Sequence, residues 1–586
     1  MSKNGELRSR PVKQGRKQER LHIPYPKGRQ ADGESVRALR SLLLEWVKEA
    51  QEDGTRSLDK EHLIEILHVV QDTYKHISAR HITALSELMG LPLAHIYEVA
   101  TFYAHFDVVL DDESPPPPLT IRVCDSLSCA LAGAEALLAA LRAGVDEKDV
   151  RVVSAPCMGR CDEAPVVQVG QYHQGHASTD NVLACVRDKK VACEMPAYQD
   201  LSYYQGQGGY RVLQRCLAGE LSFDEVVKVL EDSALKGMGG AGFPAGNKWR
   251  FVRREPGPRL MTVNADEGEP GTFKDRYYME STPHRFLEGM LIAAWAVEAT
   301  DVYIYLRDEY PSLRHVLSTE LIALKKAGLL GSVRVHLRRG AGAYICGEES
   351  AMLSSIEGRR GFPWHKPPYI SSVGLFGRPT LNQNVETLHW VSLALEHGSR
   401  WFLHHGASRH VGTDMPPRGP HSFSVSGRVK KPGVKLVAAG ITMNTLLNDH
   451  CGGMLDGHTF KGYLPGGASG GILPASMANI PLDFGQLEKY GCFLGSAAVI
   501  VLSDKDSIKD VVVNLLKFFE DESCGQCTPC RVGTEKAVQL VQQDTWDEGL
   551  LNELIGVMGD ASICGLGQAA GNPIRCALQY FREELY

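Results

Sequence analysis

The sequence predicts a multidomain α/β protein, and three observations carry that prediction. The chain has 586 residues, which corresponds to roughly three to five domains of about 100–200 residues each. Segments with the apolar pattern of strands alternate along the chain with segments of helical period. Eight of the 15 cysteines gather in two groups, one in the second hundred residues and one near the C-terminus, so we expect two separate cysteine sites.

Composition and charge exclude several classes of protein. Hydrophobic residues make up 43% of the chain and charged residues 23%, so the chain can bury large cores. The formal net charge of -7 gives no electrostatic reason to bind nucleic acid. No run of about 18 apolar residues occurs, so we expect no membrane span.

Residues 1–35 are expected to form a basic flexible arm. Residues 1–30 contain nine Lys or Arg, two Glu and no apolar stretch. A secretory signal requires such a stretch, so we expect a cytoplasmic protein whose clustered cysteines bind metal rather than form disulfides. The alternative for the arm is that it docks on a partner subunit.

Residues 36–110 are expected to form a helical bundle. Apolar side chains recur at helical spacing within 63–70 and within 82–89, and Ser78 suits a helix cap. The proline-rich segment 112–118 then reads as a stiff linker.

Four further units follow the linker. Residues 119–195 form a small α/β unit, because strand-like segments at 119–124, 150–157 and 165–170 surround a helix-like segment at 132–144. Residues 196–410 form a larger α/β domain with glycine-rich loops. Residues 411–503 are rich in strand-like segments, and residues 504–586 are helical and interrupted by cysteines.

The first cysteine group has the pattern C-x4-C, 27 residues, C-x3-C. Each pair comes directly after a predicted strand, so two adjacent loops can deliver four thiolates to one end of a small sheet. Four soft ligands suit a [2Fe–2S] cluster. A tetrahedral zinc site is the alternative, although zinc ribbons usually use tighter C-x2-C knuckles. The expected ligands are Cys124, Cys129, Cys157 and Cys161.

The second cysteine group has the pattern C-x2-C-x2-C, and a fourth cysteine follows after 33 intervening residues. This spacing wraps the chain around one face of a cubane, and the distant cysteine closes the site. Three closely spaced knuckles would compete for a single zinc ion, so we predict a [4Fe–4S] cluster. The expected ligands are Cys524, Cys527, Cys530 and Cys564, and the remaining cysteines are expected to be buried or free thiols: Cys185, Cys193, Cys216, Cys346, Cys451, Cys492 and Cys576.

The loop 237–248, GMGGAGFPAGNK, formally contains the dinucleotide fingerprint G-x-G-x-x-G. That fingerprint requires a strand before the first glycine, whereas residues 222–234 have an acidic helical pattern. We therefore do not predict a Rossmann unit here. The glycines would let the backbone approach a phosphate or a flat ring closely, and Lys248 would add positive charge.

Two more loops share this turn-rich, acidic character. Residues 264–276, NADEGEPGTFKDR, supply amide and carboxylate groups that can accept hydrogen bonds from hydroxyl groups. Residues 340–350, GAGAYICGEES, place glycine beside Glu348 and Glu349. A glycosidase-type carboxylate pair is not expected, because adjacent side chains point apart and could not flank one bond.

At these segments the chain becomes recognisable. GMGGAGFPAGNKW, NADEGEPGTFKDR, GAGAYICGEES and ESCGQCTPCRVG with SICGLG resemble, in this order, the flavin- and NADH-binding subunit of respiratory complex I. CDSLSC and APCMGRCDEAP resemble the thioredoxin-like [2Fe–2S] subunit of that complex. Both are fused here, as in the diaphorase subunits of NAD-linked formate dehydrogenases and NAD-reducing hydrogenases. The segments 301–311, 423–436 and 463–499 look most like the β subunit of molybdenum- or tungsten-dependent, NAD-dependent formate dehydrogenase.

The resemblance implies a fold and a set of cofactors. It implies a thioredoxin-like [2Fe–2S] domain, an FMN-binding α/β domain that is not a standard Rossmann fold, a β-grasp-like SLBB domain at 411–503, and a C-terminal helical bundle with [4Fe–4S]. The implied cofactors are FMN, NAD(H), one [2Fe–2S] and one [4Fe–4S]. The implied partner is a catalytic molybdenum- or tungsten-pterin α subunit with its own iron–sulfur clusters, because no pterin-binding segment is recognisable here.

The resemblance also assigns residues. The expected FMN residues are Gly237, Gly239, Gly240, Lys248, Asn264, Asp266, Glu267, Tyr344, Gly347, Glu348, Glu349, Gln383 and Asn384. The expected NAD(H) residues are Phe243, Lys248, Phe251, Glu269, Glu349, Lys366 and Tyr369, and Glu349 and Glu269 would position the reactants rather than transfer protons. Two positions depart from the pattern: Gln383 stands where relatives carry Asn, and Tyr369 where Phe is common.

The implied function is electron transfer between partner clusters and NAD+, through [4Fe–4S] and FMN and in either direction. Flavin is required because nicotinamide moves two electrons as hydride whereas clusters move one at a time. The alternatives are the diaphorase subunit of a hydrogenase, a complex I subunit, a non-enzymatic iron–sulfur carrier without flavin, and a colourless zinc-stabilised scaffold.

Overall fold

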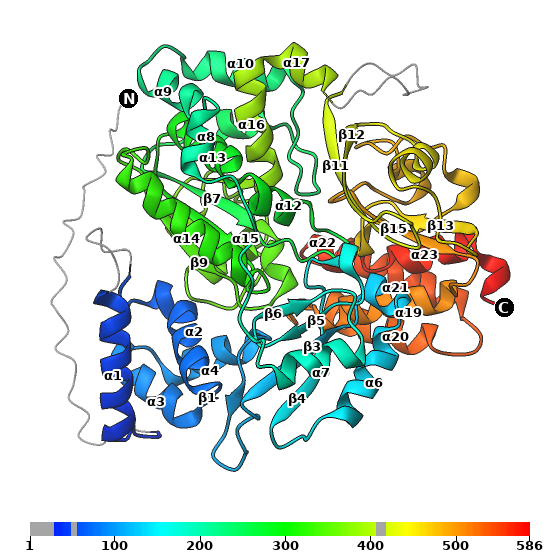
Figure 1. The fold of residues 1–586 in the computed structure, drawn as a ribbon, viewed down its shortest axis with the longest axis horizontal. Helices are drawn as coiled ribbons and strands as arrows, with labels where there is room; N and C mark the ends of the chain where they lie inside the picture. The colour runs from blue at the N-terminus through cyan, green and yellow to red at the C-terminus, as the bar shows by residue number, and fades with distance from the viewer. Residues whose placement is uncertain (1–27, 49–55, 406–417) are drawn as a thin grey trace, which may run out of the picture.

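The computed structural model describes residues 28–48, 56–405 and 418–586, and Figure 1 shows its arrangement. Most of the predicted basic arm lies outside the described residues, and helix α1 (Gly33–Lys48) begins within the last part of that segment. No helix of the described segments is both long and apolar enough to cross a bilayer.

The N-terminal unit is helical, as its periodicity predicts. It contains α1, α2 (Leu63–Tyr74), α3 (Ala79–Met89) and α4 (Leu93–Phe102). The apolar faces of these helices pack together, with Leu39, Leu67 and Leu85 fully buried. Ser78 caps α3, because its Oγ accepts a hydrogen bond from the backbone N–H of His81 at 3.2 Å.

The small α/β unit that follows has a four-stranded sheet of order β4-β3-β5-β6. Strands β3 (Leu119–Cys124) and β4 (Val150–Ala155) pair in parallel, and β5 (Val167–Val169) and β6 (Tyr172–Gln174) add antiparallel strands beyond β3. Because β3 and β4 are parallel neighbours, their carboxyl ends meet at one edge of the sheet, where both cysteine pairs follow. Its helices are α5 (Leu127–Leu131), α6 (Ala134–Gly144) and α7 (Thr179–Arg187).

The larger α/β domain is built on a parallel sheet of order β10-β7-β8-β9. Strand β8 (Ala299–Leu306) is buried along nearly its whole length, as expected for a parallel strand covered on both faces. The chain runs from β7 (Arg259–Ala265) to β8 on one side, and β10 (Thr380–Asn384) returns on the other side of β7. The carboxyl ends of β7 and β10 are therefore the topological switch point, where open α/β sheets bind ligands.

Helices surround this sheet and complete the domain. Before β7 come α8 (Leu201–Gly206), α9 (Arg211–Leu217), α10 (Phe223–Asp232) and α11 (Ala245–Arg254). Between β7 and β9 (Arg334–Arg339) come α12 (Lys274–Ser281), α13 (Pro283–Val297) and α14 (Pro311–Lys326). After β9 come α15 (Glu349–Ile356), α16 (Val385–His397) and α17 (Ser399–His404).

The remaining two units lie side by side in Figure 1. A five-stranded mixed sheet has the order β12-β11-β15-β13-β14, with β11 (Pro420–Gly427) and β15 (Ala498–Ser503) parallel at its centre. Its other strands are β12 (Gly433–Ala438), β13 (Phe460–Leu464) and β14 (Leu473–Pro474). The C-terminal bundle contains α19 (Ile508–Asp521), α20 (Thr528–Val541), α21 (Glu548–Ala561), α22 (Gly565–Ala569) and α23 (Asn572–Tyr580).

Gly289 lies where helix α13 packs closely against helix α16. A Cβ atom at this position would collide with the carbonyl oxygen of Leu388. We expect Gly289→Ala to destabilise the domain by about 1–3 kcal/mol, because two backbones packed this closely must separate. Thermal unfolding of the purified chain measures the effect.

The matched control for this prediction is Gly556→Ala in α21. Nothing lies within 4 Å of a Cβ placed there, and the position is helical and exposed. This change should stabilise the chain by up to about 1 kcal/mol through helix propensity alone. Equal unfolding temperatures for the two variants would contradict the close packing of α13 on α16.

Candidate functional site

The first cysteine group converges at one end of the small sheet. Cys124 ends β3 and Cys129 lies in α5, while Cys157 and Cys161 lie in and just after the loop that follows β4. The Sγ atoms of Cys157 and Cys161 are 3.3 Å apart, and the Cys124 thiol hydrogen-bonds with those of Cys129 and Cys157. All four side chains are buried. The fold therefore assembles the predicted four-thiol group.

The chemistry of this group fits a [2Fe–2S] cluster. Hydrogen bonds from Cys124 and Cys161, together with the Arg307 guanidinium, hold the pKa of Cys157 well below its ordinary value. The backbone N–H of Gly159 also donates to Cys157 Sγ at 3.4 Å. Buried thiolates supported by backbone donors are the ligands that iron–sulfur clusters use.

The second cysteine group lines a small cavity that also borders Ile345 and Pro363. Burial raises the pKa of Cys530 to about 12 and that of Cys564 to about 11, so these thiols require a metal to become thiolates at neutral pH. Cys527 and Cys564 directly precede α20 and α22, whose N-terminal backbone dipoles stabilise negative charge on sulfur. The cavity and its four thiols, Cys524, Cys527, Cys530 and Cys564, fit a [4Fe–4S] cluster.

The predicted flavin loops meet at the carboxyl ends of β7 and β10. The Asn264 side-chain amide donates to the carbonyl oxygen of Gly347 at 2.8 Å. A Cβ atom at Gly239 would lie 3.3 Å from Asn384 Cβ, and a Cβ atom at Gly347 would lie 3.3 Å from the Asp266 carbonyl oxygen. The four segments that carry the expected FMN residues thus come together with glycine at their closest approaches.

Two buried polar atoms in this cradle have no partner within the described part of the protein. These are Oδ2 of Asp266 and Nε2 of Gln383. Burial raises the pKa of Asp266 well above its ordinary value, despite the nearby Arg307. A buried orphan acceptor and a buried orphan donor are each costly, and a polar ligand would satisfy both. The cradle therefore fits the hydrogen-bonding groups of a flavin, and the departure at Gln383 supplies a donor.

The expected NAD(H) residues lie on the more exposed side of the cradle. Lys248 Nζ and Lys366 Nζ lie 3.5 Å and 2.8 Å from carboxylate oxygens of Glu349. Burial opposes the charge of Glu349, but the two lysines outweigh it and lower the pKa of that carboxyl group. Phe243 and Phe251 are 45% and 47% exposed, which leaves ring faces available for stacking.

Tyr369, the other expected aromatic residue, is 60% exposed. Glu348 caps α15 through Ser350 N at 2.8 Å, and its other carboxylate oxygen lies 3.2 Å from Lys366 Nζ, a lysine that it shares with Glu349. That these carboxylates do not act as a glycosidase-type pair remains a prediction.

Three further expected ligands are, like Asn264 and Glu348, already engaged by protein groups. Glu267 accepts hydrogen bonds from the backbone N–H groups of Asp275 and Arg276 at 2.8 Å and 3.1 Å. Glu269 accepts from Ser469 N at 2.8 Å and from the Tyr344 hydroxyl. These contacts anchor the 264–276 loop to its surroundings.

The third engaged ligand is Asn384. It caps α16 through Glu386 N at 3.0 Å, and its amide donates to Asp275 Oδ2 at 2.6 Å. Direct contacts of Glu267, Glu269 and Asn384 with FMN or NAD(H) remain predictions.

Sequence reasoning missed Arg307, which links the two redox sites. This buried residue follows β8 directly and donates to the carbonyl oxygens of Cys157, at 2.5 Å, and of Glu267. Tyr310 donates to Glu267 Oε2 at 3.0 Å and packs against Gly159 of the cysteine loop. The position of Arg307 at a strand end was the signal available in the sequence, because such ends form the ligand-binding edge of the sheet.

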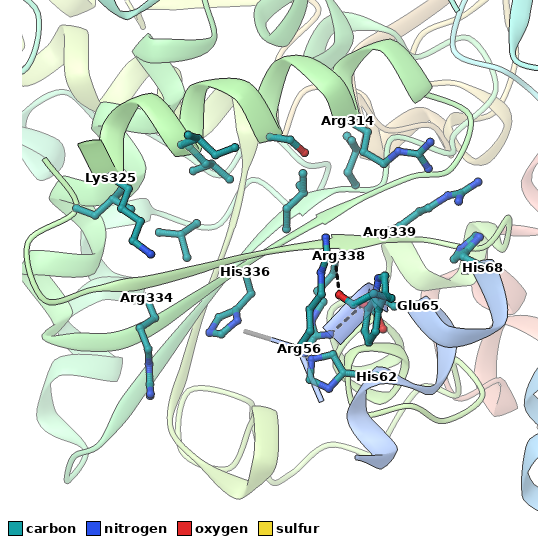
Figure 2. Close-up of a pocket in the computed structure, with 18 of the residues that line it drawn as sticks. Arg56, His62, Glu65, His68, Arg314, Lys325, Arg334, His336, Arg338 and Arg339 are labelled. Atoms are coloured by element: carbon teal, nitrogen blue, oxygen red, sulfur yellow. Dashed lines mark hydrogen bonds and ion pairs between the residues drawn. The ribbon is translucent and has the colours of Figure 1, made fainter. Parts of the chain in front are cut away.

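A larger cavity, about 610 Å³, lies elsewhere, between α2, β9 and α14 (Figure 2). None of the predicted site residues lines it. Its charges largely pair with each other or with neighbouring acids: Arg338 with Glu65 at 3.1 Å, and Arg334 with Asp301 at 2.7 Å. This cavity marks the junction of the N-terminal bundle with the α/β domain and is not the cofactor cradle.

Comparisons with known proteins find matches in three segments of the chain. The family model of the Nuo51 FMN-binding domain matches residues 230–393, that of the thioredoxin-like [2Fe–2S] ferredoxins matches 48–190, and that of the NADH-ubiquinone oxidoreductase-F iron–sulfur binding region matches 510–586. The chain is 40% identical over 407 residues to the NADH-quinone oxidoreductase F 2 component of Rhizobium meliloti (strain 1021), covering 67% of this chain and 94% of that protein. It is 38% identical over 403 residues to the NADH-quinone oxidoreductase F component of Aquifex aeolicus (strain VF5), covering 66% of this chain and 91% of that protein.

A solved structure extends the likeness over the N-terminal units. The chain superposes with a TM-score of 0.77 and 29% identity on a chain of an NAD+-reducing [NiFe]-hydrogenase in the air-oxidized state, covering 92% of this chain and 94% of the other. These findings confirm the predicted fold class and the four cofactors. The chain binds FMN and NAD(H) and carries one [2Fe–2S] and one [4Fe–4S].

Proposed function

The chain belongs to the NADH-quinone oxidoreductase F family, and from that premise we propose that it is the diaphorase subunit of an NAD-dependent formate dehydrogenase. As a member of that family it transfers electrons between NAD(H) and iron–sulfur clusters by way of FMN. The formate assignment rests on the resemblance of segments 301–311, 423–436 and 463–499. Formate itself would react on a molybdenum- or tungsten-pterin partner subunit that carries further clusters.

The observation that best supports a diaphorase is the contact between its redox sites within one chain. Arg307 joins the carbonyl oxygen of Cys157 to that of Glu267 in the flavin cradle. Ile345, which follows Tyr344 in the cradle, borders the cavity of the second cysteine group. A flavin held between these loops would lie next to both cluster sites, which one-electron transfer requires.

The protein contributes positioning rather than acid–base chemistry. FMN held in this cradle would supply the exchange between two-electron hydride transfer and one-electron transfer. Lys248 and Lys366 hold the Glu349 carboxylate in place, and Phe243 and Phe251 offer apolar faces beside it. We infer that these side chains align the nicotinamide with the flavin, while the buried Asp266 and Gln383 fix the flavin through their unsatisfied atoms.

Glu349→Ala tests this assignment. We expect the KM for NADH to rise roughly ten-fold or more, because a hydrogen bond that involves a charged group contributes about 1.5–3 kcal/mol. The iron content should not change, because Glu349 contacts neither cysteine group. Steady-state NADH oxidation with a small artificial acceptor, together with iron analysis, measures both quantities.

Glu220→Ala is the matched control, since Glu220 is an exposed loop residue whose ion pair is with the exposed Arg215. It should behave like the wild-type chain in both assays. Loss of iron from the Glu349→Ala protein, or an unchanged KM, would refute the role given to Glu349.

The formate assignment is tested by purifying the chain with its native partners. We expect molybdenum or tungsten in the assembly, FMN in the chain, and reduction of NAD+ by formate. Metal analysis and an NADH absorbance assay with formate measure these directly. An assembly that contains nickel and does not respond to formate would contradict the assignment.

The second candidate is the diaphorase subunit of an NAD-reducing hydrogenase. It is favoured by the likeness to the NAD+-reducing [NiFe]-hydrogenase chain, which extends over 92% of this chain and includes the N-terminal units. This candidate predicts nickel in the purified assembly and NAD+ reduction by H2. Membrane-bound partners would instead indicate a complex I subunit.

A further inference from the structure

Two cysteines outside both cluster sites meet in the core. Cys492 lies between the short helix Glu488–Tyr490 and β15, and Cys576 lies in the middle of α23. Their Sγ atoms are 3.6 Å apart, and the two residues are 1% and 0% exposed. Figure 1 shows α23 beside the sheet that contains β13 and β15, so this contact joins two units of the fold.

A metal site does not explain the pair. The groups that act electrostatically on both thiols are the other thiol, the Ile472 backbone and Arg575. A bound cation would therefore meet a positive guanidinium and only two ligands, whereas zinc and iron–sulfur sites use four. Neither thiol borders the small cavity of the [4Fe–4S] site.

Gly471 provides the space in which the two sulfur atoms meet. A Cβ atom at this residue would lie 2.7 Å from Cys492 Sγ and 2.9 Å from Cys576 Sγ, and its φ of +81° favours glycine. The two thiols therefore share one small space above a residue without a side chain. A disulfide would need the sulfur atoms to approach from 3.6 Å to about 2.05 Å, which is a small movement.

The loop that carries Gly471 also holds Glu269 of the cradle. Ser469 donates to Glu269 Oε1 from its backbone N–H at 2.8 Å and from its hydroxyl at 2.6 Å. Asn572 Nδ2, one helical turn before Cys576 on α23, donates to the Ser469 carbonyl oxygen at 2.9 Å. A movement of α23 toward Cys492 would therefore reach Glu269 through Ser469.

The other side of the loop is tied to the second thiol. The backbone N–H of Phe493, the residue after Cys492, donates to the Gly470 carbonyl oxygen at 3.2 Å. Phe493, next to Cys492, and Asn572, one helical turn before Cys576, thus each donate a hydrogen bond to the 467–471 loop. Drawing the two cysteines together would therefore displace this loop relative to at least one of them.

We propose that Cys492 and Cys576 are a redox-modifiable pair, which a peroxide oxidises to a disulfide and a dithiol reduces again. In the first step one thiolate attacks the O–O bond of hydrogen peroxide, forming a sulfenic acid and releasing hydroxide, which takes up a proton to become water. In the second step the other sulfur attacks the sulfenic sulfur, the S–S bond forms and a second water leaves. Two thiols and one peroxide thus give one disulfide and two waters.

The test is peptide mapping of the purified complex after anaerobic reduction and then after treatment with hydrogen peroxide at one equivalent per chain. Free thiols are alkylated before trypsin digestion. We expect a linked pair of the tryptic peptides 490–505 and 576–582, which contain one cysteine each, and its loss after treatment with dithiothreitol. Both peptides fully alkylated after peroxide, at unchanged iron content, would overturn the proposal.

Cys492→Ser and Cys576→Ser each remove one of the two sulfur atoms, so neither variant can form the disulfide. Neither variant should give the linked pair, and each should retain the iron of the wild-type protein. Cys451→Ser is the matched control, because Cys451 is equally buried but has no thiol neighbour among the described residues, and it should still form the linked pair. Linkage of one of the two peptides to a third cysteine instead would also overturn the proposal.

The effect on the nicotinamide site rests on the proposed role of Glu269, so it is measured separately. At matched iron content, we expect the oxidised wild-type protein to show a roughly three- to ten-fold higher KM for NADH, which dithiothreitol restores, while Cys492→Ser does not respond to peroxide. A disulfide with an unchanged KM would overturn the coupling to Glu269 and leave the modification site itself established. Absence of the disulfide leaves the NADH assignment intact, so the two failures are distinguishable.

Discussion

Cys564→Ser is expected to remove the [4Fe–4S] cluster and to stop electron transfer between NAD(H) and the partner subunit. Cys564 directly precedes α22, whereas the other three cysteines lie before or within the first turn of α20, so it alone lines the small cavity from a second helix. Its loss should cost about four of about six iron atoms per chain, because the [2Fe–2S] site is separate. Iron analysis and low-temperature EPR of the reduced protein measure this.

The same variant separates the reaction of NADH at the flavin from electron transfer with the partner subunit. Reduction of NAD+ by the partner's substrate should fall to background, whereas NADH should still reduce a small artificial acceptor at the flavin. Cys193→Ser is the control, since Cys193 is half-buried and belongs to neither cysteine group. Full iron content in Cys564→Ser would show that this residue is not a ligand.

Lys274→Met is expected to destabilise the flavin domain by about 3–5 kcal/mol, the usual effect of leaving a buried charge unpaired. Lys274 is 1% exposed, and its Nζ lies 3.0 Å from Asp275 Oδ1 and 3.0 Å from Glu386 Oε2. The contact with Glu386 lacks hydrogen-bond geometry and is Coulombic. Although burial opposes its charge, the two carboxylates raise the pKa of Lys274, so it stays protonated across the physiological range.

The consequence of this change should extend to the cofactor. Asp275 also accepts the amide of Asn384 at 2.6 Å, so a disturbed Asp275 would loosen the end of β10 and weaken FMN retention. Thermal unfolding and flavin release on gel filtration measure the two effects. Lys228→Met is the control, because the exposed pair of Lys228 with Asp232 contributes at most about 0.5 kcal/mol. An unfolding temperature equal to that of this control would contradict the role of Lys274.

The convergence of each cysteine group could be predicted from the sequence because the signals are local. Each cysteine pair of the first group follows a strand, and parallel pairing of β3 with β4 necessarily brings those strand ends together. The rejection of a Rossmann fingerprint also agrees with the structure. Helix α10, not a strand, precedes the glycine loop, and β7 begins only after α11. Without that strand, the glycine loop and α11 do not form the strand–turn–helix unit that the fingerprint requires.

What the sequence did not reveal are contacts between distant segments. Lys274 and Glu386 are separated by more than a hundred residues, and their ion pair depends on β10 returning beside β7. Arg307 and Cys157 come from different domains, and their contact depends on how those domains pack. No periodicity or spacing encodes such pairings. The same holds for Cys492 and Cys576, whose contact depends on α23 packing beside the β-rich unit.

The central claim is that one chain joins NAD(H), FMN and two clusters into a single redox unit. Anaerobic titration of the purified complex with NADH, followed by flavin absorbance and EPR, tests it most directly when combined with metal and flavin analysis of this chain. We predict about one FMN and about six iron atoms per chain, bleaching of the flavin by NADH, and two distinct reduced iron–sulfur signals. Iron without flavin and without reduction by NADH, or a colourless chain that contains zinc, would contradict it.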